Sequence, residues 1–202
     1  MARSTQGVRK TAGRKAGTGR PASPPAPRRA AAKASAPPPA PSAPDAQARG
    51  KDQAPVRPVR AGDVPQVTAL DERITGIAKA GYWQDVFERY SRHHPKDRFF
   101  LVATSPDGGR DARILGFIIG EIRVWEFGSA PCGWVFALSV DPDARLHGVG
   151  QALFAAVSAH FTAAGVTKMR TMVARDNPLH MMFFRGEGMM AGPYIQLEKE
   201  LS

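Results

Sequence analysis

Residues 140–150 read VDPDARLHGVG, and this run determines how the rest of the chain is interpreted. An almost wholly apolar segment, residues 134–140, comes before it, as expected of a strand that is covered on both faces. Asp141-Pro142 ends that strand, because proline has no N–H to donate to the sheet. An amphipathic helix is predicted from Gly148 to about Ala164. The run is therefore a turn from a buried strand into a helix.

The two glycines of this turn, Gly148 and Gly150, stand where the helix begins. A helix N-terminus presents unpaired backbone N–H groups and a partial positive charge. Glycine lets a diphosphate approach those groups, and Arg145 adds a charged donor beside them. The turn therefore predicts a pyrophosphate site, although a glycine-rich connection without a ligand has the same pattern. Gln151 excludes the Walker pattern, and Leu153 excludes the dinucleotide pattern G-x-G-x-x-G.

Apolar periodicity and turn residues predict the other elements. Asp63 is a candidate N-cap for the first helix. The expected strands are 56–60, 98–103, 114–124, 134–140, 166–174 and 194–198. The expected helices are 64–74, 82–94, 148–164 and 178–185. This order, β-α-α-β-β-β-α-β-α-β, indicates an α/β domain with a mixed sheet.

Charge separates the first quarter of the chain from the rest. Residues 1–55 contain eleven Lys or Arg and two acids, whereas residues 56–202 contain seventeen bases and sixteen acids. Before Pro55 the only large aliphatic residue is Val8, and there is no aromatic residue. Because such a segment cannot form a core, residues 1–54 are expected to be a disordered basic tail before a domain at 55–202. The tail would attract nucleic acid weakly, but a solvated extension explains it equally well.

Other features bear on the compartment. Cys132 is the only cysteine, so no internal disulfide is possible, which fits a reducing compartment. No apolar run approaches the ~18 residues that a membrane span needs, and the N-terminus lacks the apolar core of a secretory signal. We expect a cytoplasmic protein rather than one with an organelle transit peptide. No grouping of His, Cys, Asp and Glu has metal-ligand spacing, so no metal is expected.

The turn resembles a known signature. Residues 145–150 follow the pattern R-x-x-G-x-G after an apolar strand, similar to the acyl-CoA signature of the GNAT acetyltransferase superfamily. Asn177 and the pair Phe183-Phe184 before Gly188 resemble a second segment of that family, and residues 56–63 resemble its usual start. The resemblance covers about residues 55–200. It implies a mixed, splayed sheet flanked by helices, and an enzyme that transfers the acetyl group of acetyl-CoA to an amine.

The resemblance also implies how acetyl-CoA is held. The backbone of the strand at 138–140 would pair with the pantetheine arm, as an added strand does. The backbone of 145–150 would hold the pyrophosphate. Asn177 would face the cofactor, although it is equally suited to cap the helix that starts at Pro178. The expected cofactor residues are Leu138, Ser139, Val140, Arg145, Leu146, His147, Gly148, Val149, Gly150, Asn177 and Phe184.

Several residues are candidates for the transfer of protons. Family members often use a Tyr as the general acid where this chain has Phe184, which cannot donate a proton. Tyr194, on the last expected strand, is one substitute. Glu121 is the candidate base, ahead of Glu126. No base is needed for an amine of low pKa such as an aromatic amine. Tyr90 belongs to a helical region that often borders the acceptor in this family, but core packing explains it too.

The acceptor stays open as an amine of a small molecule or a protein, and the chain as a monomer or a homodimer. The alternative to an enzyme is a non-catalytic regulator on the same fold that binds acyl-CoA or nucleic acid. Phe184 and the basic tail favour that alternative.

Overall fold

The computed structural model describes residues 54–92, 96–106, 109 and 112–201. The predicted tail, apart from Ala54, lies outside them, as do the residues at which the second helix was expected to end. The strands are β1 (Val56–Pro58), β2 (Arg98–Thr104), β3 (Ile114–Arg123), β4 (Cys132–Val140) and β5 (Met169–Thr171). The α-helices are α1 (Val64–Thr75), α2 (Ala80–Phe87), α3 (Val149–Ala163) and α4 (Pro178–Gly186).

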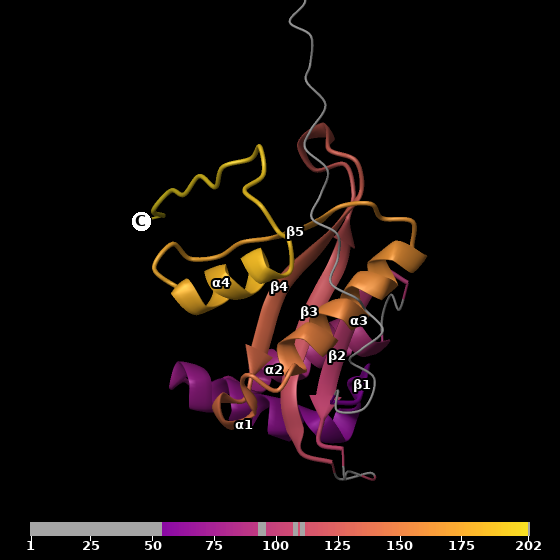
Figure 1. The fold of residues 1–202 in the computed structure, drawn as a ribbon, viewed down its shortest axis with the longest axis vertical. Helices are drawn as coiled ribbons and strands as arrows, with labels where there is room; N and C mark the ends of the chain where they lie inside the picture. The colour runs from indigo at the N-terminus through magenta and orange to yellow at the C-terminus, as the bar shows by residue number, and fades with distance from the viewer. Residues whose placement is uncertain (1–53, 93–95, 107–108, 110–111, 202) are drawn as a thin grey trace, which may run out of the picture. The chain divides into compact units, whose positions relative to one another are not determined.

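The five strands form one sheet in the order β1-β2-β3-β4-β5, as Figure 1 shows. The first four strands run antiparallel to their neighbours, and β5 pairs with β4 in parallel. The link from β4 to β5 includes α3, the crossover helix that a parallel pair requires. The predicted mixed sheet flanked by helices is therefore confirmed.

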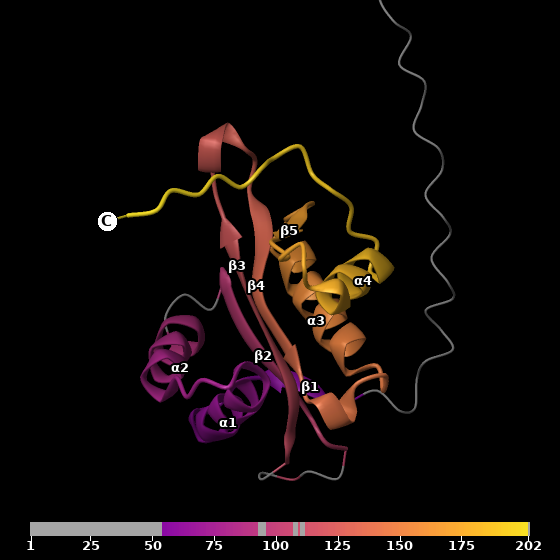
Figure 2. The same ribbon diagram turned by 90° about the vertical axis from the view of Figure 1, so that its left-hand side faces the viewer.

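Helices cover both faces of the sheet (Figure 2). On one face α1 and α2 pack with the inward side chains of β2 and β3, and Trp83 contacts Phe117 at a ring-centroid distance of 4.9 Å. On the other face Leu153, Val157 and Phe161 of α3 pack against side chains such as Ile118. Both faces are apolar because neither meets water, which explains the unbroken apolar runs of β2 and β3.

Asp63 precedes α1, as predicted, but its side chain does not cap the helix. The carboxylate accepts two hydrogen bonds from Arg57, at 2.6 and 2.9 Å, and one from the N–H of Arg60 at 2.7 Å. Partial burial works to raise the pKa of Asp63, but these bonds outweigh it and hold the pKa below its usual range. The residue therefore fixes β1 to the start of α1 rather than completing the helix end.

The second expected helix is α-helical at Ala80–Phe87 and continues as a π-helical segment at Glu88–Arg92. The strand expected at 166–174 is limited to Met169–Thr171, and the last expected strand, 194–198, was wrong, because this segment has no strand pairing. Residues 194, 195 and 197 are exposed, and the ring of Tyr194 lies 4.5 Å below the guanidinium of Arg170. The alternation of apolar residues there is a strand pattern, but a strand also needs a neighbour to pair with. None of the described helices is long and apolar enough to cross a membrane.

Gly133 offers a test of the packing between the sheet and α3. A Cβ at this position would lie 2.4 Å from the Phe161 ring, which fills the space beside the β4 backbone. We expect Gly133→Ala to lower the free energy of unfolding by about 1–3 kcal/mol, because the ring must leave its site. Urea denaturation measures this. Gly186→Ala, where a Cβ meets nothing within 4 Å, is the control and should change stability far less.

Candidate functional site

A large cavity of about 1190 Å³ lies between the end of β4, the start of α3 and α4. Its walls are mostly apolar, with a few polar groups from different elements, which is typical of a site for a small molecule or cofactor. The lining residues are Ile74, Thr75, Leu138, Ser139, Val140, Ala144, Arg145, Leu146, Gly148, Val149, Gly150, Gln151, Asn177, Leu179, His180, Met182 and Phe183.

One wall of the cavity is the edge of β4. The strands β4 and β5 pair only from Gly133 to Val135, and the hydroxyl of Thr171 donates to the carbonyl of Val135 at 2.8 Å. Beyond Val135, β4 pairs with β3 alone, within the described residues. The backbone of 138–140 therefore faces the cavity with an open strand edge, which an extended amide-containing ligand fits.

The other wall is the N-terminus of α3. The first helical hydrogen bond runs from the N–H of Ala152 to the carbonyl of Gly148 at 2.9 Å. The N–H groups of 149–151 precede it and have no partner within the helix. Gly148 has a left-handed backbone, with φ of 75°, which glycine adopts without strain. Leu146 has a φ of 68° and is fully exposed at the cavity mouth. This geometry presents backbone donors to an anion.

Packing against Phe183 also favours glycine at position 150. A Cβ there would lie 2.9 Å from the Phe183 ring, which lines the cavity. Phe184, the predicted cofactor residue, instead packs into the core against Phe154, with ring centroids 6.1 Å apart. Phe183 thus has the place that we expected for Phe184, and the two rings are neighbours in sequence on one helix.

Asn177 has the capping role that its position suggested. Its side-chain oxygen accepts from the N–H of His180 at 3.0 Å at the start of α4, and its amide nitrogen lies 3.2 Å from His180 Nδ1. Both residues also line the cavity. Burial, and then the charge of Arg145, lower the pKa of His180, which is therefore neutral at pH 7. No sequence pattern would have identified His180.

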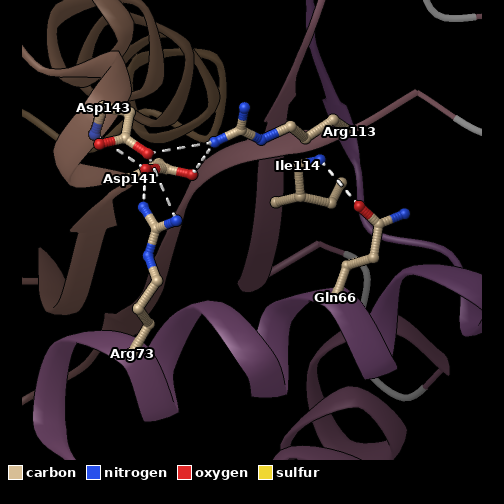
Figure 3. A network of polar contacts seen from close by, with 6 residues as sticks. All are labelled: Gln66, Arg73, Arg113, Ile114, Asp141 and Asp143. Atoms are coloured by element: carbon tan, nitrogen blue, oxygen red, sulfur yellow. Dashed lines mark hydrogen bonds and ion pairs between the residues drawn. The ribbon is translucent and has the colours of Figure 1, made fainter.

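A buried carboxylate anchors the loop that carries the expected pyrophosphate donors (Figure 3). Asp141 binds the guanidinium of Arg73 from α1 and, at 2.5 Å, that of Arg113. It also accepts from the N–H of Asp143 at 2.9 Å. The two arginines approach from segments far apart in sequence and hold the end of β4 against α1. Arg73 is followed by Ile74 and Thr75, which line the cavity.

Glu121 lies on the opposite face of the sheet, the face covered by α1 and α2. One carboxylate oxygen accepts from the hydroxyl of Tyr90 at 2.6 Å, and the other accepts from Arg123 Nε at 2.8 Å. Partial burial works to raise the pKa of Glu121, but these two donors outweigh it, so the pKa lies below its ordinary value. Burial and the bond to Glu121 raise the pKa of Tyr90. The pair is thus carboxylate and phenol at neutral pH.

Of the eleven expected cofactor residues, nine line the cavity, and His147 and Phe184 do not. Tyr194 lies on the extended C-terminal segment and does not line it either. Among the described residues no group of three or more His, Cys, Asp or Glu is arranged to hold a metal ion. Cys132 is buried.

Comparison with known proteins agrees with this geometry. Residues 65–188 match the model of the family described as acetyltransferase (GNAT). A curated relative, the mycothiol acetyltransferase of Kocuria rhizophila, is 32% identical over 107 residues, or 52% of this chain and 34% of the relative. The chain therefore spans about a third of the length of that protein.

Solved structures share the fold. The aminoglycoside N-acetyltransferase AAC(6')-Iy, in complex with a bisubstrate analogue of CoA and acetylneamine, superposes with a TM-score of 0.61 at 16% identity, over 73% of this chain and 98% of that one. A transcriptional regulator from Bacillus halodurans has a TM-score of 0.60 at 15% identity, over 74% and 100%. The match of the family model over residues 65–188 shows that the chain belongs to the acetyltransferase (GNAT) family.

Proposed function

We propose that the cavity beside β4 binds acetyl-CoA and that the domain transfers the acetyl group to a primary amine. The observation that carries this proposal is the combination of two walls in one cavity. The open edge of β4 at 138–140 suits the amides of pantetheine, and the free N–H groups at the start of α3 suit a diphosphate. A nucleotide alone lacks the pantetheine amides that would pair with the strand edge.

The order of the two walls sets the direction of the cofactor. Arg145 and the N-terminus of α3 hold the diphosphate, and the pantetheine runs along β4 from Val140 towards Leu138. The thioester then lies near the point where β4 and β5 separate, beyond Val135. The amine attacks the thioester carbonyl carbon, the C–S bond breaks, and CoA leaves as a thiolate that takes up a proton. Exposed apolar residues at the mouth, such as Leu146 and Met182, cover the bound ligand.

Each candidate for the proton donor or acceptor has a feature that opposes the role. Phe184 is buried and has no proton that it can donate, and Tyr194 is about half exposed on the C-terminal segment. Glu121 lies on the face of the sheet that α1 and α2 cover, but both of its oxygens already accept hydrogen bonds. An assignment of Glu121 as general base would require Arg123 and Tyr90 to move when the amine binds.

Binding and turnover test the proposal separately. Isothermal titration of the full-length protein should give a dissociation constant for acetyl-CoA in the micromolar range; the absence of binding at high micromolar concentration would contradict it. Release of free CoA is then followed with aminoglycosides, polyamines, peptides and arylamines. Binding without turnover of any amine would instead favour a regulator on this fold, to which the buried Phe184 lends support.

The remaining predictions concern the cell. A cytoplasmic location, a weak contact of the basic tail with nucleic acid, and a monomeric or homodimeric state are proposed from the sequence alone. Fractionation of cells, binding of the full chain to unspecific DNA at several salt concentrations, and sedimentation test them in turn.

A further inference from the structure

We infer that the acceptor is an aromatic amine, held on a patch formed by Tyr90, Trp134 and Phe136 on the face of the sheet opposite the acetyl-CoA cavity. This inference rests on the proposed function, because it names the second substrate of the same site. The three residues are called the aromatic patch below.

The patch is a set of partly open rings. Tyr90 and Phe136 meet edge to face with ring centroids 5.3 Å apart, and Phe136 is 37% exposed. Trp134 is partly buried, and the guanidinium of Arg123 lies 4.4 Å from its ring centroid. Arg123 also binds Glu121, which binds Tyr90, so the side chains of Arg123 and Glu121 connect Trp134 with the Tyr90–Phe136 pair. Aromatic rings that are only partly covered provide area for another flat ring to contact.

The patch lies beside the proposed thioester. The pairing of β4 with β3 shifts by one residue between Ile119 and Gly120, so Phe136 is an extra residue in β4. Phe136 also follows Val135, the last residue of β4 that pairs with β5. Two residues further, Leu138 lines the cavity from the other side of the strand. An amine on the patch therefore has access to the thioester where the two strands separate.

The groups around the patch are poorly suited to remove a proton from an ammonium ion. Those that face Glu121 are Tyr90 from the turn after α2, Arg98 from β2 and Arg123 from β3, and together they hold the pKa of Glu121 below its usual value. The pKa of Tyr90 is raised, so the phenol keeps its proton. An effective general base has a pKa near the working pH, and neither group does.

The protonation states of Glu121 and Tyr90 determine which type of amine can react. An alkylamine with a pKa like that of lysine is uncharged in only about one molecule in a thousand at pH 7. Its ammonium form would also meet Arg98 and Arg123, and the carboxylates of Glu121 and Glu126 are already paired with Arg123, at 2.8 and 3.6 Å. An aromatic amine is uncharged at pH 7. Its nitrogen attacks the carbonyl carbon, the adduct releases a proton to water, and the thiolate of CoA takes one up.

Two isomeric amines test the inference. The full-length protein is assayed for CoA release with p-toluidine and with benzylamine, which differ in whether the nitrogen is attached to the ring. We expect kcat/KM for p-toluidine to exceed that for benzylamine at least about tenfold at pH 7, and to stay constant from pH 7 to 9. The value for benzylamine should rise about tenfold per pH unit with its free-base fraction. Preference for benzylamine at pH 7 would overturn the inference.

Variants check the position of the ring. Phe136→Ala should raise KM for p-toluidine about tenfold without changing the affinity for acetyl-CoA, whereas Phe127→Ala, which removes a fully exposed ring from the loop after β3, should change neither. Among the described residues Asp97 is another carboxylate beside Glu121, and its Oδ1 is buried without a hydrogen-bond partner. A loss of about a hundredfold or more in Asp97→Asn would show that a base exists and would overturn the inference.

The outcomes separate the two proposals. If acetyl-CoA does not bind, the proposed function falls and the inference falls with it. If acetyl-CoA binds and an aminoglycoside or a polyamine is acetylated while p-toluidine is not, the proposed function stands and only the aromatic acceptor is wrong.

Discussion

Replacement of Gly148 by leucine should raise the dissociation constant of acetyl-CoA at least about a hundredfold. Gly148 lines the cavity at the start of α3, and no atom lies within 4 Å of the point where its Cβ would be. A side chain there would stand in the space proposed for the diphosphate. Hydrogen bonds to a charged group contribute about 1.5–3 kcal/mol each, and 1.4 kcal/mol is a factor of ten in affinity, so the loss of one or two such bonds gives this effect.

The same helix offers a matched control. Gly165 follows the C-terminal end of α3 with a φ of 78°, against 75° for Gly148, and its Cβ would also meet nothing within 4 Å. Leucine in this left-handed conformation costs about 1–2 kcal/mol at either position. Gly148→Leu and Gly165→Leu should therefore lose similar stability in urea, while only the first loses affinity for acetyl-CoA. Equal titration curves for the two variants would contradict the proposal that this loop binds the diphosphate.

The turn at 140–150 was predictable because its signals are local. A proline ends β4 within two residues, a glycine supplies the left-handed residue before α3, and apolar spacing marks the helix. The predicted strand at 134–140 was confirmed, but not its cover on both faces. Residues 138–140 are only partly buried, because they line the cavity. The apolar run is thus explained partly by a ligand site and not only by a protein core.

What sequence reasoning missed depends on contacts between distant segments. Whether residue 183 or 184 faces the cavity depends on the rotation of α4. Both rings contact Phe154 on α3, but only Phe184 is buried in the core, and Phe183 lines the cavity. The strand expected at 194–198 was wrong because alternation describes one chain, whereas a strand also requires a partner. Likewise Arg73 is 68 residues from Asp141, so no local pattern would pair them.

The second large effect is expected from Asp141→Ala, which removes the carboxylate that binds Arg73. This substitution should weaken both the fold and the cofactor site. The carboxylate is buried and accepts from Arg73, Arg113 and the N–H of Asp143. Removal of one partner from a buried ion pair costs about 3–5 kcal/mol. We expect about 2–3 kcal/mol here, because both arginine side chains are about half exposed and water can solvate them. KM for acetyl-CoA should rise about tenfold with little change in kcat, because the loop loses its anchor but the reacting groups stay.

Asp143 distinguishes the anchor from a general effect of charge. It belongs to the same cluster, at 3.5 Å from Arg73 and 3.9 Å from Arg113, but its side chain is 74% exposed against 4% for Asp141. Exposed ion pairs contribute about 0–1 kcal/mol and are screened by salt, so Asp143→Ala should have little effect on stability or KM. The loss in Asp141→Ala should persist at 0.5 M salt, because the buried carboxylate is largely shielded from ions. Removal of either carboxylate leaves the cluster with a net positive charge, which by itself would favour the anionic cofactor, so a rise in KM confined to Asp141→Ala cannot come from charge. Equal KM values for acetyl-CoA in the two variants would show that the loop does not need an anchor.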